Sequence, residues 1–115
     1  MQHLKDRTKI FALKIIRFCN TLPNDYAHRV IKNQLTRSAT SVAANYRAAC
    51  RSQSKAAFIA KLAIVEEEAD ESLFWLEILE EMEIIKDQQL MHLKEEANQL
   101  TAIIVASRKT AKRKR

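Results

Sequence analysis

The chain has 115 residues and a formal net charge of +6, and it contains no glycine and a single proline, Pro23. Turns that need a positive φ have no glycine to use, so β-hairpins and glycine-rich phosphate loops are disfavoured together. The length fits one domain, and the wealth of Ala, Leu, Ile, Glu, Lys and Arg favours amphipathic helices.

The first predicted helix covers about residues 3–21. Pro23 ends it, because proline disfavours helical backbone at the residue before it. Apolar residues recur along this helix at steps of three or four, which is the helical period. The predicted seam is Leu4, Thr8, Phe11, Ile15, Phe18 and Leu22.

A second helix is predicted from a cap at Asn24 or Asp25 to about Cys50. Its small side chains between Ser38 and Ala44 indicate either a close approach of a neighbouring helix or a bend. The predicted core positions of this helix are Ile31, Leu35, Ser38, Val42 and Ala49.

The third predicted helix is the longest, and it runs from a cap at Ser52 or Ser54 to about Ile85. It carries two apolar stripes, and one stripe would suffice for a core within the chain. The stripe predicted to face that core is Phe58, Leu62, Val65, Ala69, Ser72, Leu76 and Leu79. The second stripe indicates either a wide internal face or a subunit interface. The predicted subunit interface consists of Trp75, Ile78, Met82 and Ile85.

A fourth helix is predicted to begin after a cap at Asp87 and to end near residue 107, with residues 108–115 as a disordered basic tail. Its seam is Leu90, Leu93, Ala97, Leu100 and Ile104. Four helices with short connections predict an all-α fold, an antiparallel up-down-up-down four-helix bundle of residues 1–107 in a single domain.

Charge is sorted by position along the chain. Residues 1–61 hold 12 basic and 2 acidic side chains, whereas residues 62–107 hold 2 basic and 12 acidic ones. The last eight residues add six positive charges. This polarity predicts head-to-tail contacts between subunits and one surface suited to phosphate-rich partners.

Catalytic patterns are missing from the sequence. Di-iron chemistry in a four-helix bundle needs Glu-x-x-His on two helices, and neither His3, His28 nor His92 follows a glutamate by three residues. The carboxylates between Glu66 and Glu71 are interpreted as a solvated or subunit-facing surface. We therefore expect no enzyme activity, no metal and no cofactor.

Cys19 and the second cysteine, Cys50, lack CxxC spacing. The chain begins without the apolar run of a signal peptide, and no apolar stretch is long enough to span a membrane. A cytoplasmic location is therefore expected, with both thiols reduced in the core.

Clustered cations are the candidate nucleic-acid contacts. Contact with a phosphate backbone needs only clustered positive charge and no sequence motif, although an ordinary solvated helix face fits the same pattern. The candidate residues are Arg29, Lys32, Arg37, Arg47, Arg51, Lys55, Arg108, Lys109, Lys112 and Arg113.

Three segments resemble the small bacterial four-helix bundle proteins that are encoded by intervening sequences in 23S ribosomal RNA genes. The segments are Gln34–Arg47, Ser54–Ile64 and Glu68–Leu76. The resemblance covers about residues 4–107. Many members follow the asparagine of the first segment with Ile-Ala-Glu-Gly, whereas Tyr46-Arg47-Ala48-Ala49 stands here and indicates a divergent subgroup.

The resemblance implies an antiparallel bundle that assembles into a ring-like homopentamer. It also implies kinship with the accessory proteins of diversity-generating retroelements, basic pentameric barrels that bind nucleic acid and reverse transcriptase. It supplies no catalytic residues.

We therefore predict a non-enzymatic oligomeric scaffold that binds structured RNA or DNA by phosphate-backbone electrostatics, without base readout. An alternative is a protein-interaction adaptor whose acidic helix faces dock a basic partner such as a polymerase or reverse transcriptase. A third interpretation is an amphipathic protein of the membrane surface.

Overall fold

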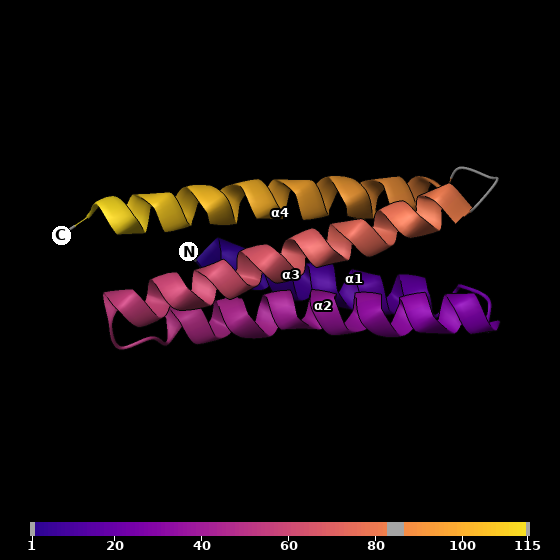
Figure 1. Cartoon of the computed structure of the whole chain (residues 1–115), viewed down its shortest axis with the longest axis horizontal. Helices are drawn as coiled ribbons and strands as arrows, with labels where there is room; N and C mark the ends of the chain where they lie inside the picture. The colour runs from indigo at the N-terminus through magenta and orange to yellow at the C-terminus, as the bar shows by residue number, and fades with distance from the viewer. Residues whose placement is uncertain (1, 83–86, 115) are drawn as a thin grey trace.

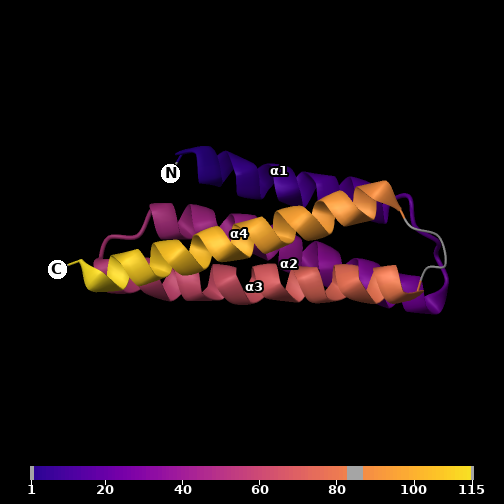
Figure 2. The ribbon, with the colours of Figure 1, turned by 90° about the horizontal axis from the view of Figure 1, so that it is seen from above.

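Four helices make up the described part of the chain, which comprises residues 2–82 and 87–114 of the computed structural model. They are α1 (Gln2–Cys19), α2 (Tyr26–Cys50), α3 (Lys55–Met82) and α4 (Gln88–Arg113). All four run along the long axis of a body measuring 50 × 20 × 19 Å, and successive helices point in opposite directions (Figures 1 and 2). Each helix packs against two neighbours, α1 and α3 both contacting α2 and α4. The predicted up-down-up-down bundle is confirmed.

Three side chains cap the starts of α2, α3 and α4. Asp25, Ser54 and Asp87 each accept hydrogen bonds from backbone N–H groups two or three residues further along, at 2.8 to 3.2 Å. These bonds satisfy donors that the first turn of a helix leaves without a partner. The predicted cap positions of all three helices are thereby confirmed.

The core contains most of the predicted seams of the four helices, with Leu22 and Phe58 only partly buried, and it also includes Ala12, Ala39 and Tyr46. The large side chains of the core are almost completely shielded from water. Among them are Phe11, Ile15, Leu35, Leu62, Leu76, Leu100 and Ile104. Two buried hydroxyls, Ser38 on α2 and Ser72 on α3, lie 2.8 Å apart and share a hydrogen bond. The small side chains of α2 thus allow α3 to approach closely, as the sequence predicts. Tyr46, also on α2, is buried, and this burial raises its pKa to about 12.

The fourth helix is longer than predicted, because α4 continues through residues 108–113 to Arg113. The Arg108 guanidinium donates to Glu66 of α3 at 2.9 Å, which ties the added turn to the bundle. Lys112 and Arg113 also favour a helix here, since cations stabilise the negative end of the helix dipole. Residues 108–113 are therefore helical and not a disordered tail.

One thiol differs from the prediction. Cys19 is buried, as expected, whereas Cys50 is exposed. Cys50 is the last residue of α2 and follows the buried Ala49, so the 100° step between successive residues turns it away from the core.

Candidate nucleic-acid interface

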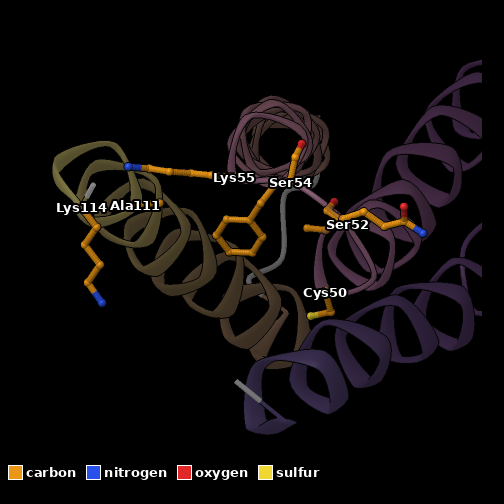
Figure 3. Close-up of a pocket in the computed structure, with 9 residues that line it drawn as sticks. Cys50, Ser52, Ser54, Lys55, Ala111 and Lys114 are labelled. Carbon is orange, nitrogen blue, oxygen red and sulfur yellow. The ribbon is translucent and has the colours of Figure 1, made fainter.

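One end of the bundle gathers positive charge from three helices. The end of α2, the start of α3 and the end of α4 lie together there (Figures 1 and 2). Lys55 and Lys114 line the same groove of about 420 Å³, with Cys50, Ser52, Phe58 and Ala111 (Figure 3). The name basic end is used below for Arg51, Lys55, Lys109, Lys112, Arg113 and Lys114.

The basic end holds uncompensated charge. All six of its side chains are exposed, and within residues 2–82 and 87–114 none of them forms an ion pair. Lysines 109 and 112 and Arg113, distant from Arg51 in sequence, reach the same end because α4 runs antiparallel to α3. Lys114 was not among the predicted contacts, but it belongs with them because it shares a groove with Lys55.

Arg47 lies one helical turn before Arg51, and it lines a different groove, between α1 and α2. Lys5 and Lys9 of α1 line the same groove, whose volume is about 430 Å³. Its floor is made of short or apolar side chains, Ala12, Leu13, Ile16, Thr40, Ala43 and Ala44. Three candidate cations that are close in sequence, Arg47, Arg51 and Lys55, are thus divided between a groove and the basic end.

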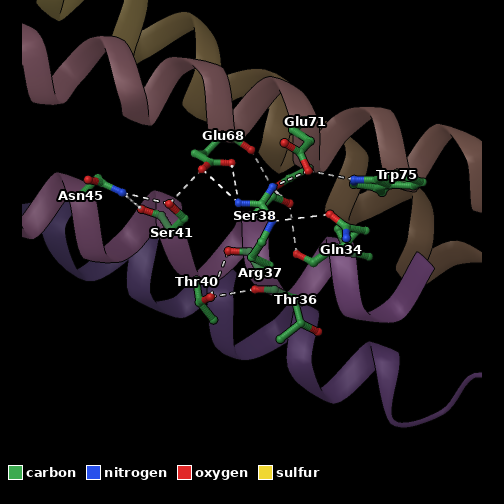
Figure 4. A network of polar contacts seen from close by, with 12 residues as sticks. Gln34, Thr36, Arg37, Ser38, Thr40, Ser41, Asn45, Glu68, Glu71 and Trp75 are labelled. Atoms are coloured by element: carbon green, nitrogen blue, oxygen red, sulfur yellow. Dashed lines mark hydrogen bonds and ion pairs between the residues drawn. The ribbon is translucent and has the colours of Figure 1, made fainter. Parts of the chain in front are cut away.

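Arg37 is engaged within the chain (Figure 4). Its guanidinium donates to Glu68 at 3.1 Å and also to Glu71, so it joins α2 to α3. Glu71 accepts a further hydrogen bond from the Trp75 indole at 3.1 Å. The bond from Arg37 and then that from Trp75 hold the pKa of Glu71 below its usual range. Because the Arg37 guanidinium bonds both carboxylates, its main role is to link α2 to α3.

Three other candidate cations are also engaged. Arg29 donates to the backbone carbonyl of Asn24 at 2.5 Å, and Lys32 donates to the Asn24 side chain at 2.6 Å. Both lie at the start of α2, at the end of the bundle opposite to the basic end. Arg108 is paired with Glu66, as described above. These cations therefore hold the loop and α4 in place.

The predicted apolar interface on α3 is partly covered by the chain itself. Trp75 and Ile78 pack against the core, whereas Met82 is 42% exposed. Ile85 lies outside the described residues. Phe74 was not predicted at this surface, yet it is 49% exposed and meets Trp75 edge-on, with ring centroids 4.9 Å apart. The sequence does contain a signal for this exposure. Phe74 lies seven residues after Glu67 and seven before Glu81, and residues seven apart share one face of a helix.

The described residues contain no group of three His, Cys, Asp or Glu side chains that could hold a metal ion. Within residues 2–82 and 87–114, no helix combines the length and apolar character that crossing a membrane requires.

Known proteins share both the sequence pattern and the fold of this chain. A sequence model of the 23S rRNA-intervening sequence protein matches residues 3–106. The chain is 34% identical to a protein of unknown function from the S23 ribosomal protein family of Bacteroides thetaiotaomicron VPI-5482, whose crystal structure superimposes with a TM-score of 0.84. The match covers 92% of this chain and 98% of the other. No curated protein matches the sequence.

Proposed function

The chain belongs to the 23S rRNA-intervening sequence protein family, and on that premise we propose that it is a non-enzymatic, oligomeric helical scaffold of the bacterial cytoplasm that binds nucleic acid through the phosphate backbone. The observation that carries the proposal is the basic end. Its six exposed cations lie in or directly beside the ends of three helices, meet at one end of a rod-shaped bundle and have no acidic partner among the described residues.

Phosphate contact suits this arrangement better than base readout does. Lysines and arginines at helix ends reach the regularly spaced phosphates of a duplex without a fixed register. Each phosphate that a cation neutralises releases condensed counterions, so affinity comes mainly from electrostatics and falls steeply with salt. Binding without sequence preference and with strong salt dependence is therefore expected.

An oligomer would multiply this weak contact. Each subunit contributes one basic end, and several held together raise the effective concentration of the second and later contacts. The resemblance to the family leads us to propose five copies in a ring. A single basic end then need not bind tightly for the assembly to do so.

Lysine footprinting tests the proposal on the unaltered protein. Acetylation of each lysine is followed by mass spectrometry with and without a short duplex RNA. We expect Lys55 and Lys112 to be acetylated more slowly in the presence of the duplex, and the protection to disappear at high salt. Lys14 is the internal control, since it is exposed on the second half of α1, away from the basic end.

Equal protection of Lys14 and Lys55, or protection of neither, would contradict the proposal. The second outcome would direct attention to the acidic helix faces and to the adaptor function, in which a basic protein partner replaces nucleic acid.

A further inference from the structure

The outer face of α3 carries a stripe of exposed side chains that its own bundle does not cover. The stripe has steps of three or four residues and consists of Ile64, Glu67, Asp70, Phe74, Glu77 and Glu81. Its four carboxylates form no ion pair within residues 2–82 and 87–114. The α3 stripe is thus an acidic ridge with an exposed phenyl ring, Phe74, near its middle.

The groove between α1 and α2 has the opposite character. Lys5, Lys9 and Arg47 line it and form no ion pair in the described chain, and Asp6 is the one carboxylate among the residues that line it. Leu13, which is 41% exposed, lies in its apolar part. This α1/α2 groove of about 430 Å³ offers an apolar place for an aromatic ring next to a cluster of cations.

We propose that the α3 stripe of one copy docks into the α1/α2 groove of a second copy, with the two bundles side by side and pointing the same way. The inference rests on the proposed function, because it names the faces through which the oligomeric scaffold assembles. It commits to this chain as its own partner, since each copy carries both a free acidic ridge and a free basic groove.

The order of side chains along the two helices supports the parallel arrangement. From its N-terminus, α1 presents a cation, a cation, a leucine and a cation, namely Lys5, Lys9, Leu13 and Arg17. In the same direction, α3 presents an acid, an acid, an aromatic ring and an acid, namely Glu67, Asp70, Phe74 and Glu77. The two helices run in the same direction within each bundle (Figure 1).

The spacing also agrees. With a rise of about 1.5 Å per residue, Lys9 lies about 6 Å before Leu13, and Asp70 lies about 6 Å before Phe74. Beyond the apolar pair, Arg17 follows Leu13 by about 6 Å and Glu77 follows Phe74 by about 4.5 Å. Placing the Phe74 ring on Leu13 therefore brings opposite charges level on both sides of it.

Such a contact joins two unlike patches. It leaves the groove of one copy and the stripe of the other available, so further copies add until the rotation closes a ring. Copies related by an axis parallel to the bundles all point in the same direction, as the order of side chains requires. The buried aromatic anchor flanked by charge pairs is typical of a specific interface.

Charge reversal tests the contact without touching the core. The stripe variant carries Asp70→Lys and Glu77→Lys, and the groove variant carries Lys5→Glu and Lys9→Glu. By light scattering we expect each variant to have the 13.3 kDa mass of one chain, whereas the wild type forms a multiple of it. A chain with all four substitutions regains the wild-type mass, because reversed stripe then meets reversed groove.

A matched control and three outcomes make the test decisive. Lys109→Glu with Lys112→Glu changes the net charge as much as the groove variant does, but away from the groove, and it keeps the wild-type mass. Unchanged masses for the stripe and groove variants, or a monomeric chain with all four substitutions, overturn the inference while the oligomeric scaffold stands. A monomeric wild type contradicts both. Circular dichroism checks that every variant remains helical.

Discussion

Neutralising two cations of the basic end should weaken the salt dependence of nucleic-acid binding by a calculable amount. Arg51→Gln and Lys55→Gln remove charge from the two sides of the α2–α3 turn. Both side chains are exposed and form no ion pair with a described residue. Their replacement should therefore change the free energy of unfolding by no more than about 0.5 kcal/mol.

The magnitude follows from the number of phosphates neutralised. Each contact contributes about 0.9 to the slope of log K against log salt for a duplex, so removing two contacts lowers the slope by about 1.8. If all six cations of the basic end contact phosphates, wild-type affinity falls roughly 2,000-fold between about 50 and 200 mM salt. The double variant should lose only about 150-fold over the same range.

Fluorescence anisotropy with a labelled short duplex RNA measures these slopes. The matched control is Lys14→Gln with Arg29→Gln, which removes the same charge away from the basic end; Arg29 is bonded to Asn24 at the opposite end of the bundle. The control should keep the wild-type slope. Equal reductions in the two variants would show that net charge, and not the position of the basic end, determines binding.

Three further predictions concern stability and reactivity. Leu76→Ala, at a fully buried position of α3, should lower the free energy of unfolding by about 2–5 kcal/mol in urea titrations; a loss below about 1 kcal/mol would contradict its place in the core. Arg7 bonds Glu96 at 2.8 Å, mainly by its side-chain hydrogen bond, and holds the pKa of Glu96 below its usual range. The stability from this pair is present above the unfolded pKa of about 4.3 and is lost as the pH falls through the lower folded pKa, so Glu96→Gln should flatten the acid limb of thermal stability against pH; an unchanged limb would refute the pairing. A thiol reagent should label Cys50 in the native protein and Cys19 only after unfolding, and equal native rates would contradict this difference.

The four helices and their buried faces were predictable because apolar side chains recur with the helical period. Leu35, Leu62, Leu76 and Leu100 all lie where the seams place them. The caps were predictable for a similar reason, since the signal at Asp25 depends only on neighbouring residues. Local pattern and local hydrogen bonding thus determine most of this fold.

The partner that each cation contacts was not predictable from the local sequence pattern. Arg37 meets Glu68 across 31 positions of sequence, and Arg108 meets Glu66 across 42. Which carboxylate a cation meets depends on the rotation and register of two packed helices. The apolar seams do not determine that rotation and register precisely enough to predict a hydrogen bond. Where α4 continues past residue 107, the same contact of Arg108 joins it to α3.

The exposure of Phe74 on α3 escaped prediction for a different reason. Phe74 follows the buried Ser72 by two positions, and hydrophobic character alone favours placing an aromatic ring inward. Trp75 and Ile78, by contrast, pack partly against the core of their own chain. Only the bundle geometry distinguishes these neighbouring side chains.

The mass of the purified protein by light scattering, with and without a short duplex RNA and at low and high salt, tests most directly whether this chain is an oligomeric scaffold that binds phosphate through its basic end. We predict a stable multiple of the 13.3 kDa chain at both salt concentrations, which gains the mass of RNA only at low salt. A protein that stays monomeric, or an oligomer that gains no RNA at low salt, would contradict the proposed function.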